Sequence, residues 1–192
     1  MTGTTRIPHA ELNGLYGAIV KRMSRKMFGE VPEPVGVAWH NRKALSLSFS
    51  VGRKMQKMRQ CDENLKSFAH MAAANLIGCS FCLDFGYFQA HNEGLDVAKA
   101  REVPRWRDSR SFTSLERDVM EYAEAMTRTP PTVTDELSAR LLKALGPSAL
   151  VELTTVIALS NFMARCNTAF GITSQEFSTA CGLEPLAVAS KT

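Results

Sequence analysis

The sequence has no long apolar run and too few cysteines for a scaffold held together by disulfides. Its longest apolar stretches, residues 15–20 and 156–159, are far shorter than the roughly 20 residues that a membrane-spanning helix needs. The first residues do not show the charged and then apolar pattern that is typical of a secretion signal. Five cysteines in 192 residues are an odd number, which leaves at least one thiol unpaired. These absences predict a protein of the reducing cytoplasm, without a membrane partner, in which a close cysteine pair is functional.

The composition is that of an ordinary globular chain, with 45% apolar and 22% charged residues. Low-complexity segments, long linkers and short-period repeats are absent from the sequence. We therefore expect one domain spanning residues 1–192, in which residues 1–34 form an N-terminal helix and a Pro-containing loop that pack on the core.

The net charge of +4 is unevenly distributed. Residues 21–59 contain ten lysines and arginines against two glutamates. No nucleic-acid-binding motif accompanies this charge, so we expect no nucleic-acid partner, and a solvated helix face explains such runs. An anionic substrate or an acidic partner surface is equally compatible with it.

Apolar spacing and capping residues predict an all-α fold of about seven helices with no significant sheet. Residues 45–51 alternate as a strand would, but no second strand-like run exists to pair with them. A capping box at residues 113–116 opens one helix, and a second at residues 173–176 is expected to open a short last helix that ends near Gly182. The remaining helices are expected at residues 8–28, 37–58, 65–77, 83–92, 135–145 and 147–170, with a loop at 29–36 and a break at Gly146–Pro147.

The most informative residues are Cys79 and Cys82, which follow a predicted helix stop at Gly78. Two thiols three positions apart lie close enough to form a disulfide. We place Cys82 in the first turn of the next helix, where free N–H groups and the positive end of the helix dipole favour a thiolate. The pattern favours redox or peroxidase chemistry.

A cysteine pair can also attach haem, bind zinc or be inert. Haem attachment needs a histidine directly after the second cysteine, and position 83 is leucine. Structural zinc needs two further ligands, whereas Cys61, Cys166 and Cys181 are scattered singly. Two buried, inert cysteines remain the plainest alternative to a redox pair.

Four side chains near the pair could tune its reactivity or shape the site. His70 lies on the preceding helix and could serve as a base if the two helices pack antiparallel, although a buried structural histidine is an equal alternative. His91 lies about 180° round the helix from Cys82 and is expected to face elsewhere. Gln89 shares the face of Cys82 and could be a polar wall or simply exposed. Asp84 is expected to be a surface carboxylate near the helix N-terminus.

Polar residues also interrupt the apolar surface of the long C-terminal helix, among them Asn161, Arg165 and Asn167. Arg165 is expected to pair with a carboxylate or to line a cavity, because a buried charge needs a partner. Structural and substrate-binding roles both remain open for these residues.

Residues 72–84 (AAANLIGCSFCLD) resemble the core motif of the AhpD-like alkylhydroperoxidases, a branch of the carboxymuconolactone decarboxylase family. Residues 112–172 resemble that family's C-terminal helices, and the resemblance covers roughly residues 35–182. It implies an AhpD-like helical bundle that forms a homo-oligomer, often a trimer or a multiple of it. It also implies a thiol-dependent peroxidase that reduces alkyl hydroperoxides with an external dithiol reductant, and without a metal or an organic cofactor.

The resemblance implies that Cys82 is the peroxidatic cysteine and Cys79 the resolving one. The family's proton relay also uses a histidine four residues after the second cysteine and a glutamate twelve residues before the first. Those positions are Gly86 and Ser67 here. His70 could replace this relay, activity could be weak, or the substrate could differ.

The resemblance leaves two alternatives to the peroxidase. One is a lactone-processing enzyme of the carboxymuconolactone decarboxylase kind, in which Arg165 grips a substrate carboxylate. The other is a non-catalytic oligomeric binding protein that has kept the fold and lost the relay.

Overall fold

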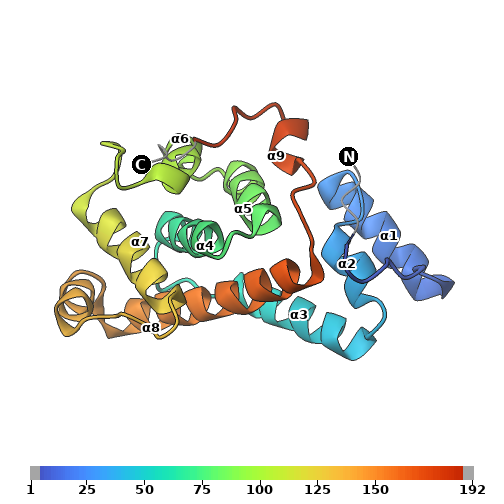
Figure 1. Cartoon of the computed structure of the whole chain (residues 1–192), viewed down its shortest axis with the longest axis horizontal. Helices are drawn as coiled ribbons and strands as arrows, with labels where there is room; N and C mark the ends of the chain where they lie inside the picture. Colours follow the sequence, from blue (N-terminus) through green and yellow to red (C-terminus); the bar gives the residue numbers. More distant parts are fainter. Residues whose placement is uncertain (1–4, 188–192) are drawn as a thin grey trace.

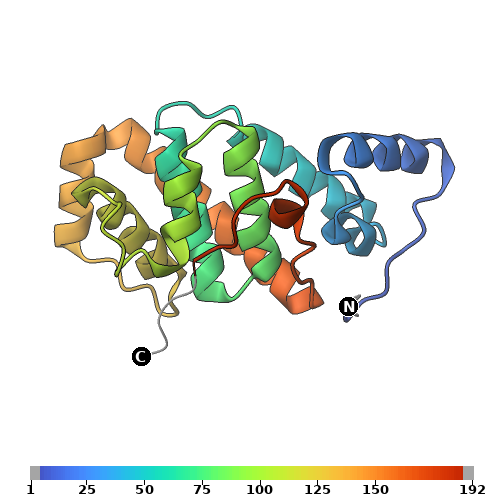
Figure 2. The same cartoon turned by 90° about the horizontal axis from the view of Figure 1, so that it is seen from above.

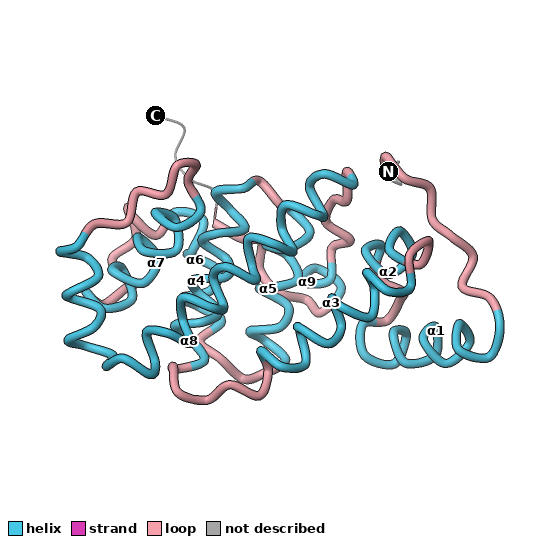
Figure 3. The backbone as a smooth tube through the Cα atoms, turned by 90° about the horizontal axis from the view of Figure 1, so that it is seen from below, coloured by secondary structure: helices cyan, strands magenta, loops and turns pink. Residues whose placement is uncertain are grey.

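A computed structural model describes residues 5–187 of the chain, and this part consists of helices and loops without a strand (Figure 3). The helices are α1 (Gly14–Phe28), α2 (Glu33–Ala38), α3 (Arg42–Met55), α4 (Glu63–Ile77), α5 (Ser80–Asn92), α6 (Val97–Glu102), the 3-10 turn η1 (Val103–Arg105), α7 (Ser114–Thr127), α8 (Asp135–Phe170) and α9 (Phe177–Ala180). The all-α prediction is confirmed, while the expected count of about seven was too low for the described residues.

Two of the missed boundaries have local causes. Residues 29–36 were expected to be a loop, but α2 begins inside them because proline is tolerated in a first helical turn, where Pro34 lies. The helix expected at 37–58 is interrupted near Asn41, whose side-chain oxygen accepts a hydrogen bond from the backbone N–H of Ala44 and so caps α3.

The predicted break at Gly146–Pro147 lies within α8. Gly146 has φ 75° and ψ 168°, which is not a helical conformation, and Pro147 follows it at the start of the second half of the helix. By length and composition α8 could cross a membrane, as core helices often could. In this fold α8 packs along α4 and α7.

Helix α4 is the centre of the fold, surrounded by α5, α7 and α8 (Figure 1). Its alanines let the neighbouring helices approach closely, and Phe68, Ala69 and Met71 are wholly buried. Lys66, also on α4, is buried against Glu152 of α8 with an N–O distance of 2.9 Å. This ion pair fixes the two helices side by side at the end opposite Gly78.

Helix α1 lies at one end of the molecule and packs mainly on α2 and the start of α3 (Figures 1 and 2). Phe28, at the end of α1, contacts the rings of Phe85 and Phe88 on α5 and of Phe177 on α9. Gln175 completes this junction, since its side chain donates to Glu30 at 2.8 Å and accepts from the backbone N–H of Glu33 at 2.7 Å. The interpretation of residues 1–192 as one domain stays a prediction.

Candidate active site

The junction between α4 and α5 brings Cys79 and Cys82 together. Gly78 ends α4 in the left-handed conformation, with φ 80°, as its glycine identity predicts. Cys79 is the N-cap of α5, and its sulfur accepts a hydrogen bond from the backbone N–H of Cys82 at 3.2 Å. The two Cα atoms are 5.3 Å apart and the sulfurs form a disulfide. Cys82 therefore lies in the first turn of α5, as expected.

The pair lies in an apolar cluster rich in phenylalanine. Cys79 is 2% and Cys82 4% exposed, so both sulfurs are shielded by neighbouring side chains. Phe81, Phe88 and Phe177 belong to the same cluster. The disulfide is thus enclosed by side chains of the folded chain.

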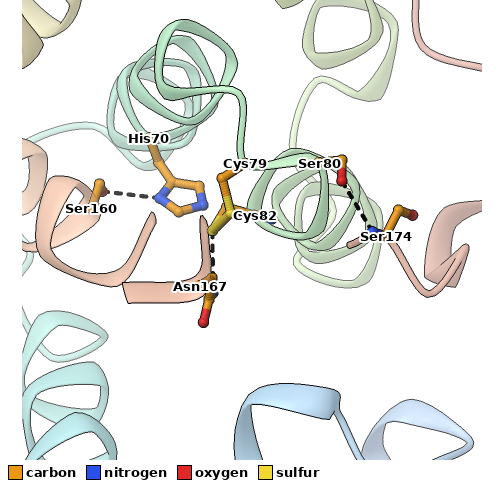
Figure 4. The surroundings of a disulfide bond; sticks show 7 residues. All are labelled: His70, Cys79, Ser80, Cys82, Ser160, Asn167 and Ser174. Carbon is orange, nitrogen blue, oxygen red and sulfur yellow. Dashed lines mark hydrogen bonds between the residues drawn. A yellow bond between two sulfur atoms is a disulfide. The ribbon is translucent and has the colours of Figure 1, made fainter. Parts of the chain in front are cut away.

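His70 lies directly beside the pair. Figure 4 shows its imidazole between Ser160 of α8 and the disulfide. Its Nδ1 is 2.9 Å from the hydroxyl oxygen of Ser160. Burial lowers the pKa of His70 below its ordinary value of 6.5, and a hydrogen bond with the backbone of Cys82 opposes this effect in part. The favoured neutral imidazole can accept a proton at the thiol pair.

Gly86, where the resemblance leads us to expect a relay histidine, lies close to His70. A Cβ atom at Gly86 would lie 3.0 Å from Cδ2 of His70, which is too close for ordinary contact. His70 therefore occupies the space that a side chain at position 86 would need. Ser67, at the position of the family's glutamate, is half-buried one turn before His70 on α4.

Asn167 is a site residue for which the sequence carries only a weak signal. It is a buried side chain of α8 whose amide nitrogen donates to the sulfur of Cys82 at 3.4 Å (Figure 4). In the sequence it stands out only as a polar interruption of an apolar helix. Its contact depends on how α8 packs against α5, which local sequence does not specify.

The expectation that Asp84 is a surface carboxylate was wrong. Asp84 is 5% exposed and accepts hydrogen bonds from the backbone N–H groups of Phe177 and Ser178 at 2.9 and 3.0 Å. It therefore caps α9 from another helix. The capping box expected at residues 173–176 is also wrong, because Glu176 is the N-cap of α9, with φ 60° and no side-chain cap.

The other candidate residues lie apart from the pair or at its margin. His91 is exposed, in agreement with the expectation that it faces elsewhere, and Gln89 is half-buried on α5. Arg165 lines a surface pocket, and its guanidinium donates to the backbone oxygen of Thr127 at 2.7 Å. The residues in the described range contain no group of three or more His, Cys, Asp or Glu that could hold a metal ion.

Comparison with known proteins agrees with this geometry. Residues 54–125, which hold both cysteines and His70, match the model of the carboxymuconolactone decarboxylase family. The uncharacterised protein YnjA of Escherichia coli (strain K12) is 35% identical over 156 residues, which is 80% of this chain and 85% of YnjA. The chain belongs to the carboxymuconolactone decarboxylase family.

Solved structures show that the fold is AhpD-like. An uncharacterised peroxidase-related protein from Ralstonia eutropha JMP134, described as an alkylhydroperoxidase AhpD core, superposes with a TM-score of 0.77 at 15% identity, covering 90% of this chain and 94% of that one. A complex of the debrominase Bmp8 with 2,3,4-tribromopyrrole gives a TM-score of 0.78 at 17% identity, covering 93% of this chain and 96% of that one. At these identities the likeness concerns the fold, and the resemblance seen in the sequence is confirmed at the level of family and fold.

Proposed function

We propose that the protein is a thiol-dependent peroxidase or disulfide redox protein that reduces alkyl hydroperoxides through Cys79 and Cys82. The observation that carries this proposal is the closed Cys79–Cys82 disulfide at the start of α5, with the imidazole of His70 beside it. Catalysis by a thiol pair needs two sulfurs that can bond without a large movement of the backbone, and their Cα separation of 5.3 Å satisfies this need.

The first half of the reaction consumes the peroxide. His70 accepts the proton of the Cys82 thiol, and the thiolate attacks one peroxide oxygen. The O–O bond breaks, Cys82 becomes a sulfenic acid, and the departing alkoxide takes a proton to leave as an alcohol. The amide of Asn167, which donates to the Cys82 sulfur, stabilises its thiolate form.

The second half forms the disulfide and then restores the dithiol. The Cys79 thiolate attacks the sulfenic sulfur of Cys82, and the leaving hydroxide is protonated to water. An external dithiol then reduces the disulfide by two exchange steps and is itself oxidised. Every electron in this cycle comes from sulfur, so the proposal needs no further cofactor.

His70 is the base in this scheme because it fills the space left at Gly86. Its lowered pKa keeps the ring neutral near pH 7, ready to accept a proton. Ser160 holds the ring by its other nitrogen, at 2.9 Å, and so orients it toward the pair. The family's histidine on α5 is thus exchanged for one on α4.

The test is peroxide consumption with dithiothreitol as the reductant. Cys82→Ser is expected to abolish catalysed consumption. Cys79→Ser, assayed without the reductant, is expected to consume one equivalent of peroxide and to leave a sulfenic acid at Cys82. Peroxide consumption by Cys82→Ser at the wild-type rate would contradict the proposal. A wild-type protein that consumes no peroxide would also contradict it and would favour a lactone-processing enzyme or a non-catalytic binding protein.

An organic halide is a second candidate substrate, because the structure of the debrominase Bmp8 with a tribromopyrrole shares the fold over 93% of this chain. The same assay with a bromopyrrole in place of the peroxide distinguishes the two. Bromide release that depends on Cys82 would favour the halide.

We further propose that the protein is a cytoplasmic homo-oligomer, a trimer or a multiple of one. Exposed apolar side chains on two helices support self-association, since Val151 on α8 is 67% and Leu15 on α1 is 82% exposed. Light scattering at micromolar concentration tests this, and a monomer would contradict it.

A further inference from the structure

A pocket of about 760 Å³ opens on the surface where the C-terminal ends of α4, α7 and α8 meet. Its volume falls within the range of small-molecule sites. Among residues 5–187, three arginines line it, namely Arg6, Arg128 and Arg165, and no aspartate or glutamate does. Leu76, Ile77 and Pro130 give it an apolar wall.

Two of these arginines are held in place by the backbone. Arg6 donates from Nη1 to the carbonyl oxygens of Thr168 and Ala169 at 2.9 and 2.8 Å. Arg165 donates from Nη2 to the carbonyl oxygen of Thr127 at 2.7 Å. Each guanidinium has further N–H groups, so these contacts fix its position without using all its donors.

The arginines of the pocket have no carboxylate partner among the described residues, and the carbonyl oxygens at the ends of α7 and α8 compensate the charge of two of them only in part. Within residues 5–187, no ion pair joins Arg6, Arg128 or Arg165 to a carboxylate. Three like charges around one concave surface repel each other and concentrate a positive potential there. An anion would relieve this repulsion, and guanidinium groups match the geometry of carboxylate and phosphate oxygens.

The pocket is separate from the thiol pair. Ile77 lies between them, since it lines the pocket and also packs against the cluster that contains Cys79 and Cys82. Neither cysteine lines the pocket. An occupant would therefore not need to react at the sulfurs, and its binding can be tested independently of the proposed peroxidase activity.

We propose that this pocket binds a small organic anion, with a carboxylate or phosphate head group on Arg128 and Arg165 and an apolar body against Leu76, Ile77 and Pro130. The basic wall selects the head group, and the apolar wall selects a ligand with a hydrocarbon part over an inorganic ion.

Calorimetric titration of the whole protein with octanoate, octyl phosphate and octanol tests the proposal. At least one of the two anions is expected to bind about tenfold or more tightly than octanol, because hydrogen bonds between charged groups are stronger than those to a neutral hydroxyl. Whichever of octanoate and octyl phosphate binds more tightly shows whether the pocket prefers a carboxylate or a phosphate head group. The Cys79→Ser/Cys82→Ser double variant is expected to bind equally well, whatever the fate of the peroxidase proposal.

Arg128→Gln is the decisive variant, because the described residues show no hydrogen bond from the Arg128 side chain to the backbone, whereas Arg6 and Arg165 each make one or more. It is expected to weaken anion binding about tenfold. Arg110→Gln, at an exposed arginine outside the pocket, is the matched control and should change nothing. Octanol that binds as tightly as both anions would overturn the proposal. An Arg110→Gln variant that loses as much anion affinity as Arg128→Gln would also overturn it. Failure of both anions to bind would also overturn it, and a change of oligomeric state in Arg128→Gln would then assign the pocket to a contact between copies.

Discussion

The imidazole of His70 packs against Gly86 so closely that a Cβ atom at position 86 would lie 3.0 Å from its Cδ2. The two residues come from α4 and α5, the helices on either side of the cysteine pair. Glycine at position 86 leaves room for His70 and Met71, and the backbone conformation does not demand glycine there, since Gly86 lies inside a helix without a positive φ.

A Gly86→Ala substitution tests this relationship. Alanine in a helix interior normally stabilises by roughly 0.5–1 kcal/mol relative to glycine. At Gly86 we expect no such gain, because the methyl group must displace His70 and Met71, each 3.0 Å away. Gly52→Ala in α3 is the control, since a Cβ there meets nothing within 4 Å and should give the full gain. Urea denaturation of both variants measures the difference. Equal stabilisation at the two positions would show that His70 does not fill this space.

His70→Ala should raise the pKa of the Cys82 thiol and slow its oxidation. A positioned base contributes about a hundredfold or more to a rate, so at least a tenfold loss is expected. The measurement is the pH dependence of thiolate absorbance, together with the rate of reaction with peroxide. His91→Ala serves as the control, because His91 is exposed and its replacement is expected to leave both quantities unchanged. If a folded His70→Ala variant keeps the same thiol pKa and oxidation rate, His70 contributes to packing and not to the reactivity of Cys82.

The folded state should lose stability in mild acid because of His70. Burial lowers the pKa of His70 below 6.5, so the unfolded chain binds a proton more readily than the folded chain. The stabilisation from the neutral ring is fully present above about pH 6.5 and is lost as the pH falls below it. The free energy of unfolding, measured by urea denaturation on both sides of that pH, should fall more steeply for the wild type than for His70→Gln. Parallel curves would mean that the imidazole is accessible to protons in the folded state.

The buried ion pair between Lys66 and Glu152 should matter far more than an exposed one. Lys66→Met leaves Glu152 charged and buried with one partner fewer, so we expect a loss of about 3–5 kcal/mol. Arg140→Met breaks the bidentate pair with Asp118, in which the arginine is half exposed, and should cost less than about 1 kcal/mol. Denaturant midpoints of the two variants provide the comparison. Similar losses would mean that burial of the Lys66 pair carries no special weight.

The helices and the cysteine pair could be predicted well because their signals are local. Three signals fix the backbone within a few residues of themselves: Gly78, the capping box at Thr113 and the break at Gly146. Each is found where it was expected. Asp84 was wrongly expected at the surface because its partners, Phe177 and Ser178, are more than ninety residues away.

The surroundings of the thiols could be predicted only in part. The spacing of His70 from the cysteines indicates a place near the pair, but its contact with Ser160 of α8 spans 90 residues, beyond the reach of any periodicity. The contact of Asn167 with Cys82 depends in the same way on the packing of α8. Such contacts follow from tertiary packing, which one sequence does not reveal.

The measurement that tests the central claim most directly is peptide mapping of the fully reduced protein after one equivalent of an alkyl hydroperoxide, with free thiols alkylated. We expect a disulfide between Cys79 and Cys82 and reduced thiols at the other three cysteines. Burial raises the pKa of the Cys61 thiol to about 11, with a further contribution from Glu152, which keeps that thiol protonated and unreactive. Cys79 and Cys82 that remain alkylatable, while Cys61 or Cys181 is oxidised, would contradict the claim.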